Sequence, residues 1–376
     1  MATLILKNAR VFTGTAVLPG ASVVLAGGRI QAVAPADFAA PDAEYLDLRG
    51  QWLVPGLVDL QLYGGSRQFL NEQPTADTVR HLLETHRRNG TTTVLPTLYS
   101  TSFEVIRRAI RAVRHVRAEH PFGVAGLHVE GPFLNPEKRG AHSAAYVRPP
   151  SQPELTDLLI AGSDVVRILT LAPEMFTPEQ LDWLGRTPFL LSAGHTNATY
   201  RQATDAFNAG VPLATHLYNA MRGFEGREPG VVGAIFDHPT VRASIIADGF
   251  HCDYAAVRLA HRLLGDRLFL ISDATFANPP RPALDFEDFI IRYHAGRYTN
   301  QEGRLAGSAI TLLDAVRNCI RHVGLKPEEA LRMASTVPAE IIGLGDQLGK
   351  IEPGYVANLV VLDSDWQCRR VFVEGR

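Results

Sequence analysis

The middle of the chain alternates short apolar runs with amphipathic stretches, and this alternation strongly limits the folds available to it. Segments such as 76–88 and 199–208 have the spacing of amphipathic helices, and 308–323 continues that pattern after the last apolar run. The apolar runs number eight, at 57–62, 93–97, 124–129, 166–171, 189–193, 213–217, 243–247 and 268–272. Alternation of strand and helix is typical of a parallel sheet. Eight such units over about 280 residues predict an α/β fold of the (β/α)8 TIM-barrel type, with an open doubly wound sheet as the alternative.

The two ends of the chain resemble each other and differ from the middle. Residues 3–9, 22–26 and 28–34 are short β-branched runs separated by glycines, and 358–362 and 370–373 are of the same kind. A chain that begins and ends in β-structure is expected to join its termini in one domain. We therefore predict a small β-sandwich domain from residues 1–53 and 346–376, with the catalytic barrel at 54–345.

Composition excludes several classes of partner. The chain has 376 residues, 46% of them hydrophobic, and a formal net charge of -2. This near-neutral balance predicts neither nucleic-acid nor membrane-surface binding, and no run reaches the roughly 18 apolar residues that span a bilayer. Cys252, Cys319 and Cys368 lie far apart and resemble reduced cysteines. With no signal-peptide pattern at the N-terminus, we expect a cytoplasmic enzyme.

Ionisable residues recur directly after the apolar runs. Glu130 follows the third run, His195 follows the fifth after Gly194, the sixth carries His216 near its end, Asp273 follows the eighth, and the seventh leads into an Asp248-Gly-Phe-His251 segment. The carboxyl ends of barrel strands meet at one rim, which is where barrel enzymes carry their catalytic residues. These side chains are therefore expected to lie together.

Each of these residues also has an ordinary explanation on its own. A histidine after a strand is more often hydrogen-bonded than metal-bound, Asp273 could cap a helix, and Glu130 could belong to a turn. Two histidines and two carboxylates buried on one rim, however, require a cation or a partner. Glu130, His195 and His216 fit a catalytic divalent metal with a position left for water, and Asp273 then suits proton transfer. Zinc is favoured, with Fe(II), Mn(II) and Co(II) open.

At these residues the chain resembles the amidohydrolase superfamily, and within it the family of N-acetylglucosamine-6-phosphate deacetylases. The resemblance runs through nearly the whole chain, and the Asn219-Ala-Met and Arg227-Glu-Pro-Gly runs are specific to the deacetylases. It is carried by Val54-Pro-Gly-Leu-Val-Asp59, Gly126-Leu-His-Val-Glu-Gly-Pro-Phe133, Gly194-His-Thr-Asn197, Thr215-His-Leu-Tyr-Asn-Ala-Met221, Gly226-Arg-Glu-Pro-Gly230, Ala247-Asp-Gly-Phe-His251, Ser272-Asp-Ala-Thr275 and Leu305-Ala-Gly-Ser308.

The resemblance implies a role for each matching residue. Glu130, His195 and His216 would bind one metal per subunit, and Asp273 would be the general base and then the acid. His251 would contact the substrate and help stabilise the oxyanion. The remaining residues would bind the sugar phosphate: Ala141, His142, Asn219, the Ala220 backbone, Arg227 and the Ala306-Gly307 backbone. The family also implies a homodimer in which each subunit lends a residue to its neighbour's phosphate site.

One departure concerns the metal count. Many members of the superfamily carry His-x-His after the first barrel strand, where this chain has Gln61-Leu-Tyr63. An amide and a phenol are poor ligands for a divalent metal, so we predict one metal. The alternatives are a deacetylase of a related amino sugar phosphate, another amide or nucleobase hydrolase of the superfamily, a non-catalytic sugar-phosphate binder, and a phosphosugar isomerase.

Overall fold

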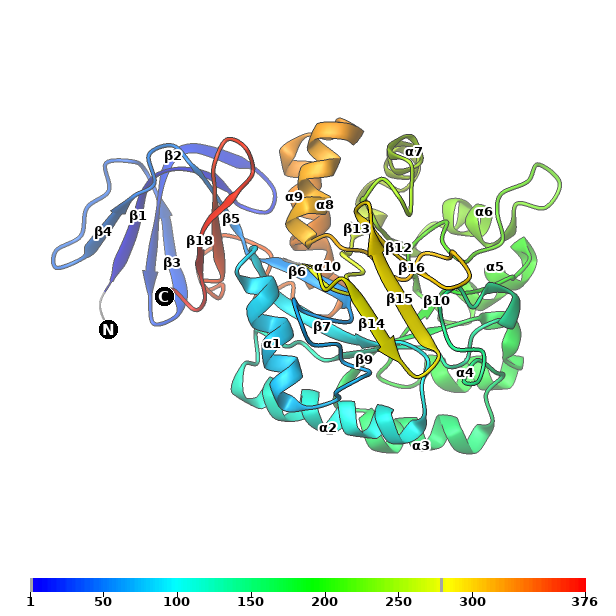
Figure 1. Ribbon diagram of the computed structural model, residues 1–376. Helices are drawn as coiled ribbons and strands as arrows, with labels where there is room; N and C mark the ends of the chain where they lie inside the picture. The colour runs from blue at the N-terminus through cyan, green and yellow to red at the C-terminus, as the bar shows by residue number, and fades with distance from the viewer. Residues whose placement is uncertain (1–2, 278–279) are drawn as a thin grey trace.

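The computed structural model describes residues 3–277 and 280–376 and places a barrel beside a smaller β-domain (Figure 1). One parallel sheet forms the barrel, in the order β13-β12-β11-β10-β9-β8-β7-β6. The strands are β6 (Leu57–Leu62), β7 (Thr91–Leu98), β8 (Leu127–Glu130), β9 (Val166–Leu171), β10 (Leu190–Ala193), β11 (Leu213–Ala214), β12 (Arg242–Ile245) and β13 (Leu268–Leu270). All eight predicted strands are confirmed.

The sheet closes on itself just beyond its two outer strands. The backbone N–H of Asp273 donates to the carbonyl of Gln61 at 2.9 Å, and that of Tyr63 donates to Ala274 at 2.9 Å. Leu62 pairs with Ala274 in parallel. These bonds join the first strand to the end of the eighth, so the TIM-type barrel is confirmed and the open sheet is excluded.

Helices cover the outside of the barrel, each with an apolar face against the strands. In α2, Ile106, Ile110 and Val113 are buried at helical spacing, and the Ser102 side chain caps the helix by accepting from Val105. The helices are α1 (Ala76–Arg87), α2 (Phe103–Glu119), α3 (Gln152–Gly162), α4 (Pro178–Gly185), α5 (Tyr200–Asn208), α6 (Gly230–Asp237), α7 (Tyr254–Leu264), α8 (Leu312–Asn318), α9 (Pro327–Ala334) and α10 (Thr336–Ile341). No helix of the described residues is long and apolar enough to cross a membrane.

The helix predicted over 308–323 begins later than its apolar spacing indicates. The Ser308 N–H donates to the carbonyl of Asp273 at 2.7 Å, which holds this residue in the barrel rim. Thr311 then caps α8 through a reciprocal capping box with Asp314. A π-turn, Cys319–Val323, completes the segment.

Both ends of the chain contribute to the smaller β-domain, as predicted. Its sheet has the order β18-β17-β5-β1-β2-β3, with β4 also paired to β1. The C-terminal β17 pairs antiparallel with β5, which leads directly into the barrel. Its strands are β1 (Leu4–Phe12), β2 (Val17–Ala26), β3 (Arg29–Ala34), β4 (Glu44–Asp47), β5 (Trp52–Pro55), β17 (Leu359–Leu362) and β18 (Cys368–Phe372). The limits 1–53, 54–345 and 346–376 stay predictions.

A third sheet, which the sequence pattern did not indicate, follows the last barrel strand in the chain and precedes α8, and it runs across the front of the barrel in Figure 1. It consists of β14 (Ala283–Phe286), β15 (Phe289–His294) and β16 (Arg297–Asn300). Phe289 packs against Tyr99 with ring centroids 4.8 Å apart, and Ser143 donates a hydrogen bond to Asp288 at 2.5 Å. This small sheet therefore supports residues next to the carboxyl rim of the barrel.

Candidate active site

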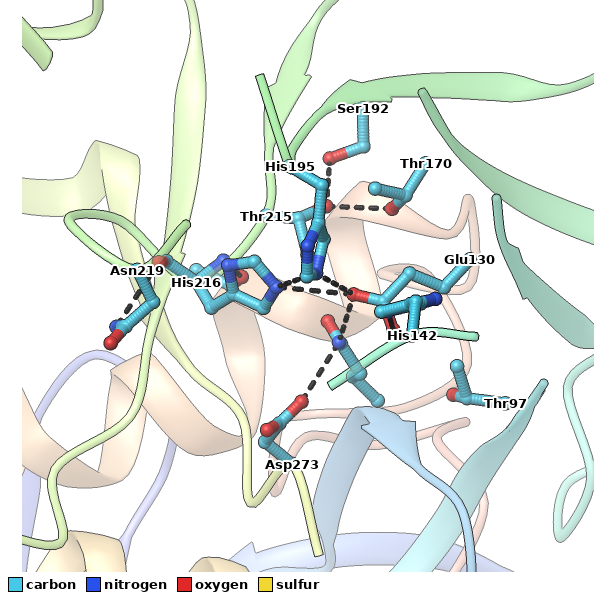
Figure 2. A network of polar contacts seen from close by, with 12 residues as sticks. Thr97, Glu130, His142, Thr170, Ser192, His195, Thr215, His216, Asn219 and Asp273 are labelled. Atoms are coloured by element: carbon cyan, nitrogen blue, oxygen red, sulfur yellow. Dashed lines mark hydrogen bonds and ion pairs between the residues drawn. The ribbon is translucent and has the colours of Figure 1, made fainter. Parts of the chain in front are cut away.

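Three predicted metal ligands converge at the carboxyl rim of the barrel (Figure 2). Glu130 ends β8, and His195 and His216 stand beyond the ends of β10 and β11. Nε2 of His216 lies 3.0 Å from Nε2 of His195 and 3.1 Å from Oε1 of Glu130. Nε2 of His195 lies 3.4 Å from the same oxygen. The fold therefore brings together residues that are up to 86 positions apart in sequence.

An unusual backbone conformation directs these side chains inward. His195, His216 and Asp273 have φ of 48°, 38° and 55°, in the left-handed region that non-glycine residues rarely adopt. Each lies two or three residues beyond the end of a barrel strand, so the chain turns at a similar place on three strands. Backbone strain of this kind costs on the order of 1–3 kcal/mol per residue and is concentrated at functional sites.

The donor set fits a divalent cation. Nδ1 of His195 donates to the carbonyl of Lys138 at 2.9 Å, which leaves the Nε2 lone pair directed at His216 and Glu130. Burial raises the pKa of Glu130, but the contacts with His142, His195 and His216 outweigh burial and leave it well below its usual value. Ligands around tetrahedral zinc stand about 3.3 Å apart, and the three distances here are close to that spacing.

Asp273 is linked to Glu130 through the side-chain amide of Gln61, which contacts both carboxylates. Its Oδ1 accepts from Nε2 of Gln61 at 2.8 Å and lies 3.1 Å from the hydroxyl of Tyr63. Burial raises the pKa of Asp273 well above its usual value, and the negative charge of Glu130 raises it further. A cation bound to Glu130 would offset that charge and favour the ionised carboxylate.

One cavity of about 320 Å³ holds these groups and most of the predicted substrate-binding residues. The predicted residues on its wall are Glu130, Ala141, His142, His195, His216, Asn219, Ala220, His251, Asp273 and Gly307. Ala306 is fully buried, its N–H bonded to Tyr298 and its carbonyl to the Thr275 hydroxyl, and Leu305 lines the cavity beside Gly307 in its place. Arg227 is exposed and does not line the cavity of its own chain.

Two histidines on the wall have defined hydrogen-bonding roles. Nδ1 of His142 accepts from the Ser100 N–H at 3.1 Å, so its Nε2 carries the proton and points toward Glu130, 3.3 Å away. Nδ1 of His251 lies 2.7 Å from Oδ2 of Asp248. Nδ1 donates to this carboxylate, so in the neutral ring Nε2 is an acceptor suited to a sugar hydroxyl, and only the imidazolium could donate to an oxyanion.

Known proteins share this architecture over its whole length. A family model described as the amidohydrolase family matches residues 52–376, and one described as the NagA composite domain matches 5–53. The N-acetylglucosamine-6-phosphate deacetylase of Haemophilus influenzae is 35% identical over 99% of this chain and 98% of its own. The solved structure of the deacetylase of that name from Pasteurella multocida has a TM-score of 0.95 at 34% identity, covering 99% and 98% of the two chains.

The chain belongs to the amidohydrolase family. This confirms the resemblance stated from the sequence motifs. The family is metal-dependent, and the Glu130, His195 and His216 cluster could hold such a metal. One relative has a different sugar in its name: an N-acetylgalactosamine-6-phosphate deacetylase of Shewanella is 36% identical over 89% of this chain and 85% of its own.

Sequence reasoning missed several residues of the site. Lys138 and Arg304 place cationic groups on the cavity wall, and Nη1 of Arg304 donates to the carbonyl of Gly140 at 3.2 Å. Tyr99 stacks on Tyr63 with centroids 3.9 Å apart. Arg304 directly precedes the Leu305-Ala-Gly-Ser308 run, which is the one signal that could have pointed to it.

Asp59 organises the closure of the barrel next to the site. Its Oδ1 accepts from the backbone N–H groups of Gln61 at 3.3 Å and Ser272 at 3.2 Å. Burial raises the pKa of Asp59 to about 7. The residue therefore fixes the two segments that carry Gln61 and Asp273.

Proposed function

We propose that this chain hydrolyses the acetamide of N-acetylglucosamine 6-phosphate to glucosamine 6-phosphate and acetate. The observation that carries the proposal is the convergence of Glu130, His195 and His216 beside Asp273 in one cavity. Whole-length similarity to deacetylases of that substrate supports the choice of sugar. A non-catalytic binder has no need of a second buried carboxylate beside the ligand cluster, and an isomerase has no need of the cluster.

The residues of the cavity have separate roles in the proposed reaction. Glu130, His195 and His216 would hold a divalent metal, which would supply Lewis acidity toward water and the amide carbonyl. Asp273 takes the proton of the attacking water and returns it to the departing amine nitrogen. His251 holds a sugar hydroxyl through its Nε2, His142 lines the sugar pocket, and the Asn219-Ala220 segment receives the phosphate.

We assign one divalent cation to each subunit, zinc being the first candidate and iron, manganese and cobalt the others. Gln61 and Tyr63 support the single site, because an amide and a neutral phenol stand where a second metal would need ligands. We further place the enzyme in the cytoplasm, consistent with its cysteine usage and near-neutral charge.

Acetate release from three sugars tests the proposal. We expect turnover of N-acetylglucosamine 6-phosphate and much weaker turnover of unphosphorylated N-acetylglucosamine. A phosphate held by one charge-assisted hydrogen bond contributes about 1.5–3 kcal/mol, or about 10- to 100-fold in kcat/KM. Equal rates with and without phosphate would contradict the substrate. Faster turnover of N-acetylgalactosamine 6-phosphate would instead favour the epimer named for the Shewanella relative.

The position of Arg227 supports a homodimer. The residue lies on an exposed loop before α6, and Phe224 on the same loop is 62% exposed. An exposed aromatic residue on a loop is typical of an interface. We propose that Phe224 packs on a second copy and that Arg227 reaches the phosphate bound in the partner's cavity.

Hybrid dimers of two impaired variants test this arrangement. We co-express Arg227→Ala with Asp273→Asn under different affinity tags and purify the doubly tagged dimer. If Arg227 acts across the interface, one of the two hybrid sites is intact and kcat/KM returns to roughly half of the wild-type value per dimer. If Arg227 acts within its own chain, both hybrid sites are defective and activity stays low. The two single-variant homodimers are the controls.

A further inference from the structure

Tyr63 places its hydroxyl between the two carboxylates of the site. It directly follows β6, and its hydroxyl donates to Oε2 of Glu130 at 2.6 Å and lies 3.1 Å from Oδ1 of Asp273. The side chain is 1% exposed, and its ring stacks on Tyr99 with centroids 3.9 Å apart. Packing therefore fixes where the hydroxyl lies, independently of any bound ligand.

Gln61 contacts the same two carboxylates as Tyr63. Nε2 of Gln61 lies 3.0 Å from Oε1 of Glu130 and 2.8 Å from Oδ1 of Asp273. The same nitrogen lies 2.8 Å from the Tyr63 hydroxyl, whose own hydrogen goes to Oε2 of Glu130, an oxygen that also lies 3.3 Å from Nε2 of His142. Gln61 and Tyr63 together thus contact three of the four carboxylate oxygens. The fourth, Oδ2 of Asp273, accepts no hydrogen bond from the described residues and belongs to a residue on the cavity wall.

We infer that Tyr63 is a positioning residue that orients both carboxylates, Glu130 toward the metal and Asp273 toward the substrate. With Oε2 of Glu130 held by the phenol, Oε1 is the oxygen next to His195 and His216. With Oδ1 of Asp273 held by Tyr63 and Gln61, Oδ2 is the oxygen left for proton transfer. The part of this inference that concerns Asp273 rests on the proposed deacetylase function, whereas the part that concerns Glu130 does not.

The same contacts give the phenol a steric role. Its oxygen stands 2.6 Å from one carboxylate and 3.1 Å from the other, so a second cation bridging Glu130 and Asp273 would collide with it. Removing a group that hydrogen-bonds to a metal ligand typically lowers metal affinity or activity by about 10- to 100-fold. Tyr63 is expected to act on this scale at both carboxylates.

The test is Tyr63→Phe, which keeps the ring and its stacking on Tyr99 and removes only the hydroxyl. We expect the affinity of the metal-free protein for zinc, measured by chelator competition, to fall by about 10- to 100-fold. At saturating zinc we expect kcat to fall by a similar factor while KM for the phosphosugar stays within about three-fold, because the hydroxyl acts on Asp273 rather than on sugar binding.

Tyr298→Phe is the matched control, because Tyr298 is also buried but its hydroxyl donates to the carbonyl of Arg281, outside the cavity wall. Unchanged zinc affinity in Tyr63→Phe overturns the role at Glu130, and unchanged kcat at saturating zinc overturns the role at Asp273. If the wild type shows no deacetylase activity but Tyr63→Phe still loses zinc affinity, the proposed function fails and the role at Glu130 stands.

Discussion

Replacing Asp273 with asparagine is expected to lower kcat by about 10²- to 10⁴-fold, the usual effect of losing an acid/base group. Asparagine keeps the size of the side chain and can still accept from Gln61, which lies 2.8 Å from Oδ1. It cannot take up a proton from water or return one to the amine. KM and metal content should change little, because Glu130, His195 and His216 keep their positions.

Steady-state kinetics and metal analysis of Asp273→Asn together decide the assignment. Asp157→Asn is the control, because Asp157 is an exposed residue that pairs with Arg107 on the surface of the barrel. Turnover of Asp273→Asn near that of the wild type would remove Asp273 from proton transfer. Loss of metal together with activity would instead show that Asp273 is a ligand.

The barrel and the ligand cluster could be predicted because they depend on local pattern and on one topological rule. Apolar runs are visible in a single sequence, and parallel strands necessarily bring their carboxyl ends to one rim. Glu130, His195 and His216 each stand at or within two residues of the carboxyl end of such a run, so their convergence required no knowledge of loops. The small sheet from Ala283 to Asn300 could not be predicted, because its short strands carry charged residues and show little alternation of apolar and polar residues.

The rest of the site depends on tertiary geometry that the sequence does not display. The positive φ of His195 and Asp273 depends on how the backbone turns beyond the barrel strands. Neither residue type by itself predicts that conformation. From the sequence, Tyr63 indicates only that a histidine ligand is absent at this position. Its proposed role depends on the hydrogen bond that its hydroxyl donates to Glu130 at 2.6 Å. Similarly, Leu305 lines the cavity where Ala306 was predicted to do so. The backbone N–H and carbonyl of Ala306 are hydrogen-bonded to Tyr298 and Thr275 instead.

Replacing Glu130 with glutamine is expected to abolish the stabilisation of the protein by metal as well as its activity. A cation that binds only the folded state stabilises it by about 4 kcal/mol when present at about 1,000 times its Kd. Metal added to the metal-free wild type should therefore raise Tm measurably. In Glu130→Gln the ligand set has no anion, and Nε2 of His195 and His216, 3.0 Å apart, must share a divalent cation with a neutral amide.

Thermal unfolding with and without zinc at one scan rate measures this difference directly. Glu119→Gln is the matched control, because Glu119 pairs with Arg80 on the exposed side of α2 and should respond to zinc as the wild type does. A zinc-dependent rise of Tm in Glu130→Gln equal to that of the wild type would place the metal elsewhere. The contrast is informative without any assay of turnover, because it depends on the negative charge that Glu130 places 3.4 Å from His195 and 3.1 Å from His216.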